Sequence, residues 1–178
     1  AQAEAGTYST PYAATTRATG DLRYAFTFPQ VGAVEFWLRP YFLYDVAFQP
    51  RILLVGSNVS GHQFSVFYDN ATDKLNAYIY LDGSNYRFAA STSAYTAAAN
   101  LNIWQHVKLV WNISAQTLAL YVNEVLQTGS GTAGSVTSFA PVATMYLMTN
   151  ADATTPGDSL MTDLAIWDTA DTSTAHYT

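Results

Sequence analysis

Short segments of alternating apolar and polar residues recur along this chain about every ten residues, and turn-forming residues separate them. In one segment Phe64, Val66 and Tyr68 share a face, and the turn-forming run 69–73 follows it. No segment keeps the 3.6-residue apolar period of a helix over three turns. We count about eleven candidate strands, and this pattern predicts an all-β sandwich or barrel. The candidates are 22–28, 33–38, 51–56, 63–68, 75–81, 86–90, 103–113, 117–123, 125–127, 143–149 and 160–167.

The length and apolar content of the chain suit one domain with a two-layer core. Its 178 residues lie within the usual size of a single domain, and 49% of them are apolar. We expect an extended lead-in over 1–20, the folded domain over 21–170 and a C-terminal tail over 171–178. No apolar run approaches the about 20 residues of a membrane-spanning helix, so membrane insertion is not expected.

Charge and cysteine content exclude several classes of function. Two Lys and five Arg in a chain of net charge −6 form no basic patch, which argues against binding to nucleic acid or to an anionic membrane surface. The sequence has no Cys, which excludes disulfides, thiolate nucleophiles and cysteine-based metal sites. Only 11% of the residues are charged, so neutral hydrogen-bonding groups supply most of the polarity.

Two successive strand candidates, 103–113 and 117–123, have matching faces. Pairing them as a hairpin gives one apolar face for the core and one mixed face outside it. We expect the mixed face to receive a ligand or a neighbouring subunit. The apolar face comprises Val107, Leu109, Trp111, Ile113, Leu118, Leu120 and Val122, and the mixed face His106, Lys108, Val110, Asn112, Ala119, Tyr121 and Asn123.

Four short motifs occur in order at matching spacing: VEFWLRP at 34–40, WQHV at 104–107, LYVNE at 120–124 and LAIWD at 164–168. Together they resemble the laminin-G-like and pentraxin-like branch of the concanavalin A-like jelly rolls, over roughly residues 20–170. The resemblance implies a two-sheet antiparallel β-sandwich that binds glycans or proteins and seldom catalyses a reaction.

The first eighteen residues carry a second resemblance. AQAEAGTYSTPY followed by TTRA at 15–18 is similar to a segment of tailed-bacteriophage structural proteins, where it joins an upstream β-domain to a concanavalin A-like domain. This implies a domain on the virion surface, on a fibre, tail or capsid appendage. It would bind host glycan or other virion proteins, and it would be a homo-oligomer, most often a trimer. The alternative is a secreted cellular lectin or adhesin, monomeric and calcium-assisted.

Catalysis is not expected from the acidic residues. Glycosidases need two carboxylates that flank the scissile bond, and the laminarinase-type branch places them as Glu-x-Asp-x-Glu on one strand. The chain has three Glu, at 4, 35 and 124, and none has an Asp two residues away. We therefore predict no catalytic residue, and we interpret Glu35 as a solvent-facing strand residue and His106 as a surface residue.

No cofactor is required by the sequence, and calcium is the one metal for which it offers hard oxygen ligands. The loop with Asp69, Asn70 and Asp73 is interpreted first as a β-turn with Asx capping. The resemblance argues against a family-type calcium site, because Thr162 stands where calcium-binding members often carry an acidic residue. The predicted calcium ligands lie in the long loop before the last strand and are Asn150, Asp152 and Asp158.

Tyrosines in two places are candidate ligand-binding residues. Sugar rings stack on aromatic rings, while carboxylates and hydroxyls bind the sugar hydroxyl groups. The alternative is that these tyrosines form a plain sheet surface or a subunit contact. The candidates are Tyr41, Tyr44 and Asp45 after Pro40, and Tyr78, Tyr80 and Tyr86 on the outward phase of two strands.

Two further interpretations concern packing. Trp37, Trp111 and Trp167 are expected in the core. The glycine-rich run 129–134 lacks the Lys and the following helix of a phosphate-binding loop, and it is interpreted as a flexible turn.

Overall fold

The computed structural model describes residues 22–41, 49–57, 61–91, 101–137, 139–149 and 159–169. Within these ranges every regular element is a β-strand, and none is a helix of the length and apolarity needed to cross a membrane. The strands are β1 (Leu22–Ala25), β2 (Val31–Pro40), β3 (Arg51–Gly56), β4 (Gln63–Asp69), β5 (Lys74–Asp82), β6 (Asn85–Ala90), β7 (Gln105–Asn112), β8 (Thr117–Val122), β9 (Val125–Leu126), β10 (Gly129–Ala133), β11 (Thr144–Leu147) and β12 (Ser159–Trp167).

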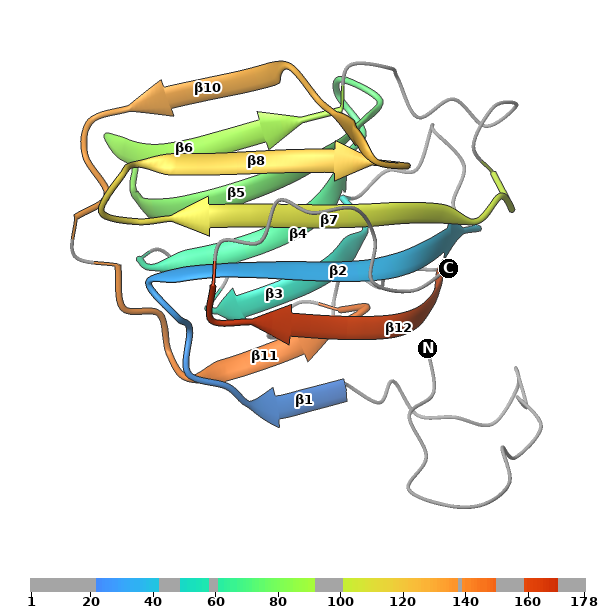
Figure 1. Ribbon diagram of the computed structural model, residues 1–178, viewed down its shortest axis with the longest axis horizontal. Helices are drawn as coiled ribbons and strands as arrows, with labels where there is room; N and C mark the ends of the chain where they lie inside the picture. Colours follow the sequence, from blue (N-terminus) through green and yellow to red (C-terminus); the bar gives the residue numbers. More distant parts are fainter. Residues whose placement is uncertain are drawn as a thin grey trace.

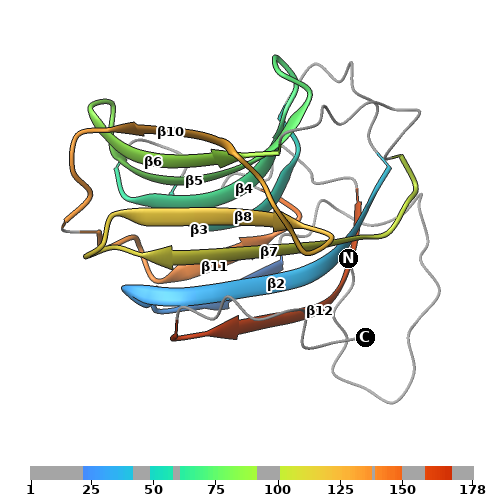
Figure 2. The ribbon, with the colours of Figure 1, turned by 45° about the horizontal axis from the view of Figure 1, so that its top comes forward.

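The strands form two antiparallel sheets that pack face to face, which confirms the predicted sandwich. The seven-stranded sheet has the order β1-β11-β3-β4-β5-β6-β10, and the five-stranded sheet has the order β12-β2-β7-β8-β9. In Figure 1 the five-stranded sheet overlies the seven-stranded sheet, and Figure 2 shows the same two layers tilted. Strands distant in sequence are neighbours in both sheets, as in β2 beside β7 and β1 beside β11.

The core lies between the sheets and centres on Trp111. Its ring stacks on Phe28 at 4.9 Å between centroids and contacts Phe64 at 5.1 Å. The indole Nε1–H donates to the carbonyl of Pro29 at 2.8 Å, so the polar atom of this buried side chain is satisfied. A Cβ on Gly32 would lie 2.5 Å from the Trp111 ring, so only glycine permits this close approach of β2 to the indole.

Strands β7 and β8 form the predicted hairpin, with the predicted apolar face. Trp111 pairs with Leu118 and Leu109 pairs with Leu120, so their apolar side chains share the face toward the core. The opposite face of β7 carries His106 and Lys108, as expected from the period of two.

The run 129–134 is not a flexible turn, and that interpretation was wrong. Residues 129–133 form the edge strand β10, which pairs with β6 along five residues. Small residues suit the site because Gly129 lies against Ala90, where a Cβ would be 2.8 Å from the Ala90 carbonyl oxygen. This strand is therefore held by backbone pairing, and its small residues show no apolar alternation.

The last strand, β12, contains a β-bulge between Thr162 and Ala165. Asp163 adopts a left-handed backbone conformation there, with φ of 54°. The extra residue lets Met161 and Leu164, three positions apart, both pack against the core. After the bulge, Ala165 pairs with Glu35 on the outer face of the five-stranded sheet.

Candidate functional site

Tyr78, Tyr80 and Tyr86 form one continuous aromatic row on the outer face of the seven-stranded sheet; we call this set the tyrosine row. Tyr78 and Tyr80 lie two positions apart on β5, and Tyr86 is the β6 partner of Tyr80. The Tyr78 ring stacks on Tyr80 at 5.7 Å and on Tyr86 at 5.4 Å, with interplanar angles of 19° and 18°. The sequence therefore correctly predicted that these three side chains share a face.

Further aromatic side chains border the tyrosine row. Phe67 on β4 and Phe88 on β6 meet the Tyr78 ring edge to face, at 6.4 and 5.7 Å. The guanidinium of Arg51 lies 4.5 Å from the Phe67 ring centroid. Three neighbouring strands thus contribute to one half-buried aromatic surface.

The rings of the tyrosine row are half-buried, and the Tyr78 ring is stacked on both of the others. Burial raises the pKa of Tyr78, and the neighbouring Tyr86 and Tyr80 raise it further. A tyrosine phenol is protonated at neutral pH in any case, so it can both donate and accept hydrogen bonds. Such a surface suits hydroxyl-rich ligands or the polar rim of a protein partner.

Of the first tyrosine group, only Tyr41 lies among the described residues. Its side chain is 40% exposed and lies beside Arg39, with 5.6 Å between the guanidinium carbon and the ring centroid. Tyr44 and Asp45 fall within 42–48, outside the described residues, so their role stays a prediction. The structure does not bring Tyr41 to the tyrosine row, which is on the other sheet.

The loop at 69–73 is an Asx-capped turn, as predicted from the sequence. The Asp69 carboxylate accepts hydrogen bonds from the Ala71 N–H at 3.2 Å and from the Thr72 hydroxyl at 2.7 Å. Gln49 and Asn76 side chains donate to the same carboxylate. These hydrogen bonds occupy both carboxylate oxygens of Asp69 and stabilise the turn.

The predicted calcium ligands Asn150, Asp152 and Asp158 lie outside the described residues and remain a prediction. In the part of the chain that the structure describes, no group of three or more His, Asp or Glu side chains is gathered closely enough to hold a metal ion.

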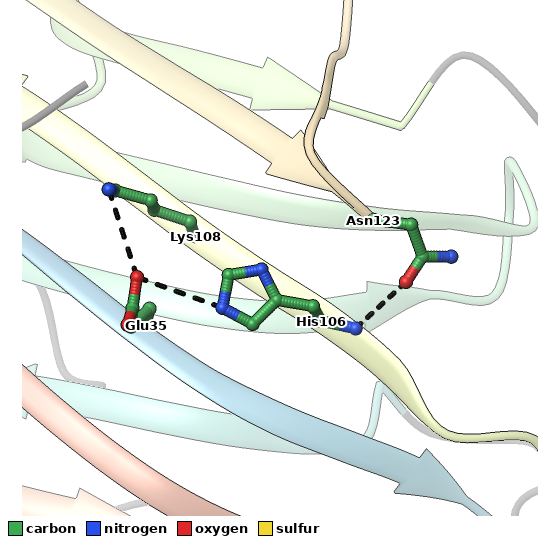
Figure 3. Close-up of polar contacts among 4 residues, drawn as sticks. All are labelled: Glu35, His106, Lys108 and Asn123. Atoms are coloured by element: carbon green, nitrogen blue, oxygen red, sulfur yellow. Dashed lines mark hydrogen bonds and ion pairs between the residues drawn. The ribbon is translucent and has the colours of Figure 1, made fainter. Parts of the chain in front are cut away.

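Glu35 and His106 are not surface residues, and both interpretations were wrong. Glu35 is 0% exposed and His106 is 3% exposed, although both lie on the outer face of the five-stranded sheet. Figure 3 shows the Glu35 carboxylate between Lys108 and His106, with Oε2 at 3.7 Å from both Lys108 Nζ and His106 Nε2. We call these three residues the buried charge cluster.

Two tryptophan side chains flank this cluster. The Trp37 ring lies 5.3 Å from the His106 ring, and the Lys108 ammonium lies 6.0 Å from the Trp167 ring centroid. Trp111 is in the core as predicted, whereas Trp37 and Trp167 are on the outer face, contrary to that prediction. They alternate with core residues such as Phe36 and Ile166, so the period of two turns them outward.

Two opposing effects shift the pKa of the His106 imidazole. Burial lowers its pKa, and the attraction of Glu35 only partly opposes this effect. His106 is held in position through its backbone, since its N–H donates to Asn123 Oδ1 at 2.9 Å (Figure 3). A neutral imidazole beside a Lys–Glu ion pair, all buried, indicates a structural role for the cluster.

Sequence reasoning missed Arg39 and Trp104 as site residues. Arg39 ends β2 and Trp104 precedes β7, and their side chains meet at 5.9 Å between guanidinium carbon and ring centroid. No local pattern connects them, because the contact depends on the pairing of β2 with β7.

Comparisons with known proteins agree with this architecture. A family profile described as "Concanavalin A-like lectin/glucanases superfamily" matches residues 7–175. A search of curated protein sequences gives no significant match.

Solved structures share the fold at low sequence identity. A heptameric SAP-like pentraxin from Limulus polyphemus has a TM-score of 0.60 and 18% identity, over 84% of this chain and 70% of the pentraxin. The receptor-binding domain of the botulinum neurotoxin C/D mosaic serotype has a TM-score of 0.59 and 16% identity, over 79% of this chain and 33% of that domain. The binding domain of botulinum neurotoxin DC, solved with rat synaptotagmin II, has a TM-score of 0.60 and 17% identity, over 80% and 33%. The chain thus spans about a third of these toxin domains, and the likeness concerns the fold.

Proposed function

This chain belongs to the concanavalin A-like lectin/glucanases superfamily, and from that premise we propose that it is a non-enzymatic domain that binds carbohydrate on a host surface. The observation that carries the proposal is the tyrosine row, in which the Tyr78 ring stacks on Tyr80 and on Tyr86 across the outer face of β5 and β6. Half-buried tyrosines on a rigid sheet supply contact area and hydrogen bonds at low entropic cost.

Two features of the acidic residues support binding without catalysis. Glu35 is enclosed and ion-paired with Lys108, so it is not available to a substrate. Glu124 is exposed in the turn between β8 and β9. The pair of carboxylates that glycoside hydrolysis requires is thus not formed by the Glu residues in the described part of the chain.

We place the domain on the exterior of a bacteriophage virion, on a fibre, tail or capsid appendage. The support is the resemblance of residues 1–18 to the linking segment of tailed-phage structural proteins. Host glycan or other virion proteins are the proposed partners, and a trimer is the proposed assembly.

A secreted lectin or adhesin is the second candidate. It is favoured by the predicted calcium ligands Asn150, Asp152 and Asp158, since calcium in an adjacent loop would assist a monomeric lectin. A monomer whose sugar binding disappears with a chelator would support this candidate over the virion domain.

The test is binding of the purified chain, of known oligomeric state, to a glycan array and to bacterial envelopes, with calcium and with chelator. We expect saturable binding that Tyr80→Ala weakens at least about tenfold, because a stacked aromatic ring and one hydroxyl are lost. Tyr24→Ala is the matched control, since Tyr24 is 39% exposed and lies on β1, away from the row. Absence of glycan binding by a folded oligomer, or equal effects of the two substitutions, would contradict the proposal.

A further inference from the structure

We propose that Arg39, Tyr41 and Trp104 form a separate binding site for a sugar residue that carries a carboxylate; we call these three residues the arginine site. The inference rests on the proposed glycan-binding function and names a class of sugar. It does not depend on the tyrosine row, which lies on the other sheet.

The arginine site is held in place by backbone contacts between distant segments. Arg39 Nε donates to the Asn102 carbonyl at 3.0 Å, and the Asn102 N–H donates to the Pro40 carbonyl at 2.8 Å. These two hydrogen bonds tie the end of β2 to the segment that precedes β7. The guanidinium is therefore positioned before any ligand arrives, which lowers the entropic cost of binding.

The Arg39 guanidinium keeps most of its hydrogen-bonding capacity. It contacts the Tyr41 and Trp104 rings at 5.6 and 5.9 Å, and within the described part of the chain its one hydrogen bond uses Nε. Arg87 differs, because its guanidinium donates hydrogen bonds to five protein acceptors. These are the carbonyls of Tyr86, Ala133, Gly134 and Gln116 and the side-chain oxygen of Gln116. Arg39 thus retains two Nη groups for an external acceptor.

The chemistry of the site favours a carboxylated sugar. A planar guanidinium fork matches a carboxylate with two parallel hydrogen bonds. The Tyr41 and Trp104 side chains are 40% and 39% exposed, and their rings suit the apolar face of a pyranose. Two exposed apolar side chains add to the rings of Tyr41 and Trp104: Ile103, which precedes Trp104, and Leu160, which pairs with Arg39 from β12. An anion, an apolar ring face and flanking hydroxyls occur together in uronic and sialic acids.

The experiment compares acidic oligosaccharides with neutral counterparts by calorimetry on the full chain. The probes are an oligogalacturonide, a glycan ending in sialic acid, and the carboxyl-reduced form of each. We expect one acidic probe to bind and its reduced form to bind at least about tenfold more weakly, as for the loss of a charged hydrogen bond.

Three variants locate the binding. Arg39→Gln and Trp104→Ala are expected to weaken binding of the acidic probe about 10- to 100-fold. Lys74→Gln, which removes one positive charge elsewhere on β5, is the control for long-range attraction and is expected to have little effect.

The outcomes separate this inference from the proposed function. Binding of neutral probes that depends on Tyr80 and not on Arg39 would support the proposed function and overturn the arginine site. Acidic-probe binding that Arg39→Gln does not weaken, or equal binding of an acidic probe and its carboxyl-reduced form, would also overturn it. Failure of every acidic probe would overturn the arginine site, whereas the proposed function falls only if the glycan array and the bacterial envelopes also show no binding.

Discussion

Replacing Glu35 by Gln tests the buried charge cluster most directly. The Glu35 carboxylate lies 3.7 Å from the Lys108 ammonium, and both side chains are at most 4% exposed. With an effective dielectric constant of about 20, Coulomb's law gives about 4 kcal/mol of attraction at that separation. Removing one partner of a buried ion pair typically costs about 3–5 kcal/mol, because the remaining charge loses that attraction. We therefore expect Glu35→Gln to lower the free energy of unfolding by about 4 kcal/mol.

The assay is urea-induced unfolding followed by tryptophan fluorescence, with the free energy taken from the midpoint at unchanged slope. For a chain of this size, a loss of about 4 kcal/mol lowers the melting temperature by about 8–16 °C. The double variant Glu35→Leu/Lys108→Met removes both charges and is expected to recover most of the loss, since apolar pairs replace buried ion pairs at little cost. A cost below about 1 kcal/mol for Glu35→Gln, the value of an exposed pair, would refute the reasoning.

Three further predictions concern stability. Burial lowers the pKa of His106 in the folded state, so the contribution of neutral His106 to stability is complete above the unfolded-state pKa of about 6.5 and is lost as the pH falls through the folded pKa. The free energy of unfolding, measured between pH 7.5 and 4.5, should therefore fall more steeply with acid for the native chain than for His106→Asn. Equal slopes would contradict this. Gly32→Ala should lower the free energy of unfolding by about 1–3 kcal/mol, measured by thermal unfolding, because the alanine Cβ would lie 2.5 Å from the Trp111 ring. No change in stability would show that β2 can shift. Arg87→Met should cost about 2–4 kcal/mol in the same assay, since it removes the buried guanidinium that donates to the carbonyls of Ala133 and Gly134. Unchanged stability would show that water replaces these hydrogen bonds.

The sequence alone determined the strand pattern and the phases of the central hairpin. Val107, Leu109 and Trp111 point into the core because strand side chains alternate with a period of two, and their spacing shows that period directly. The same local rule placed Tyr78 and Tyr80 on one face, and the run of turn-forming residues identified the turn that Asp69 caps. These features depend on residues close in sequence, so they are visible before the chain folds.

Side-chain burial on the outer sheet face was decided only by the tertiary structure. Glu35 and His106 occupy outward positions, and alternation alone assigns such positions to solvent. Trp37 and Trp167 also point outward, and their rings lie beside the His106 and Lys108 side chains of β7. The edge strand β10 was missed for a related reason, since small residues pair through the backbone and carry no apolar alternation.

The arginine site was also decided by the tertiary structure. Arg39 and Asn102 are 63 positions apart, and they meet because β2 pairs with β7. Local alternation specifies which face of a strand is apolar, but the identity of the neighbouring strand depends on the packing of the whole sandwich. A binding site assembled across strands therefore becomes visible only when that packing is complete.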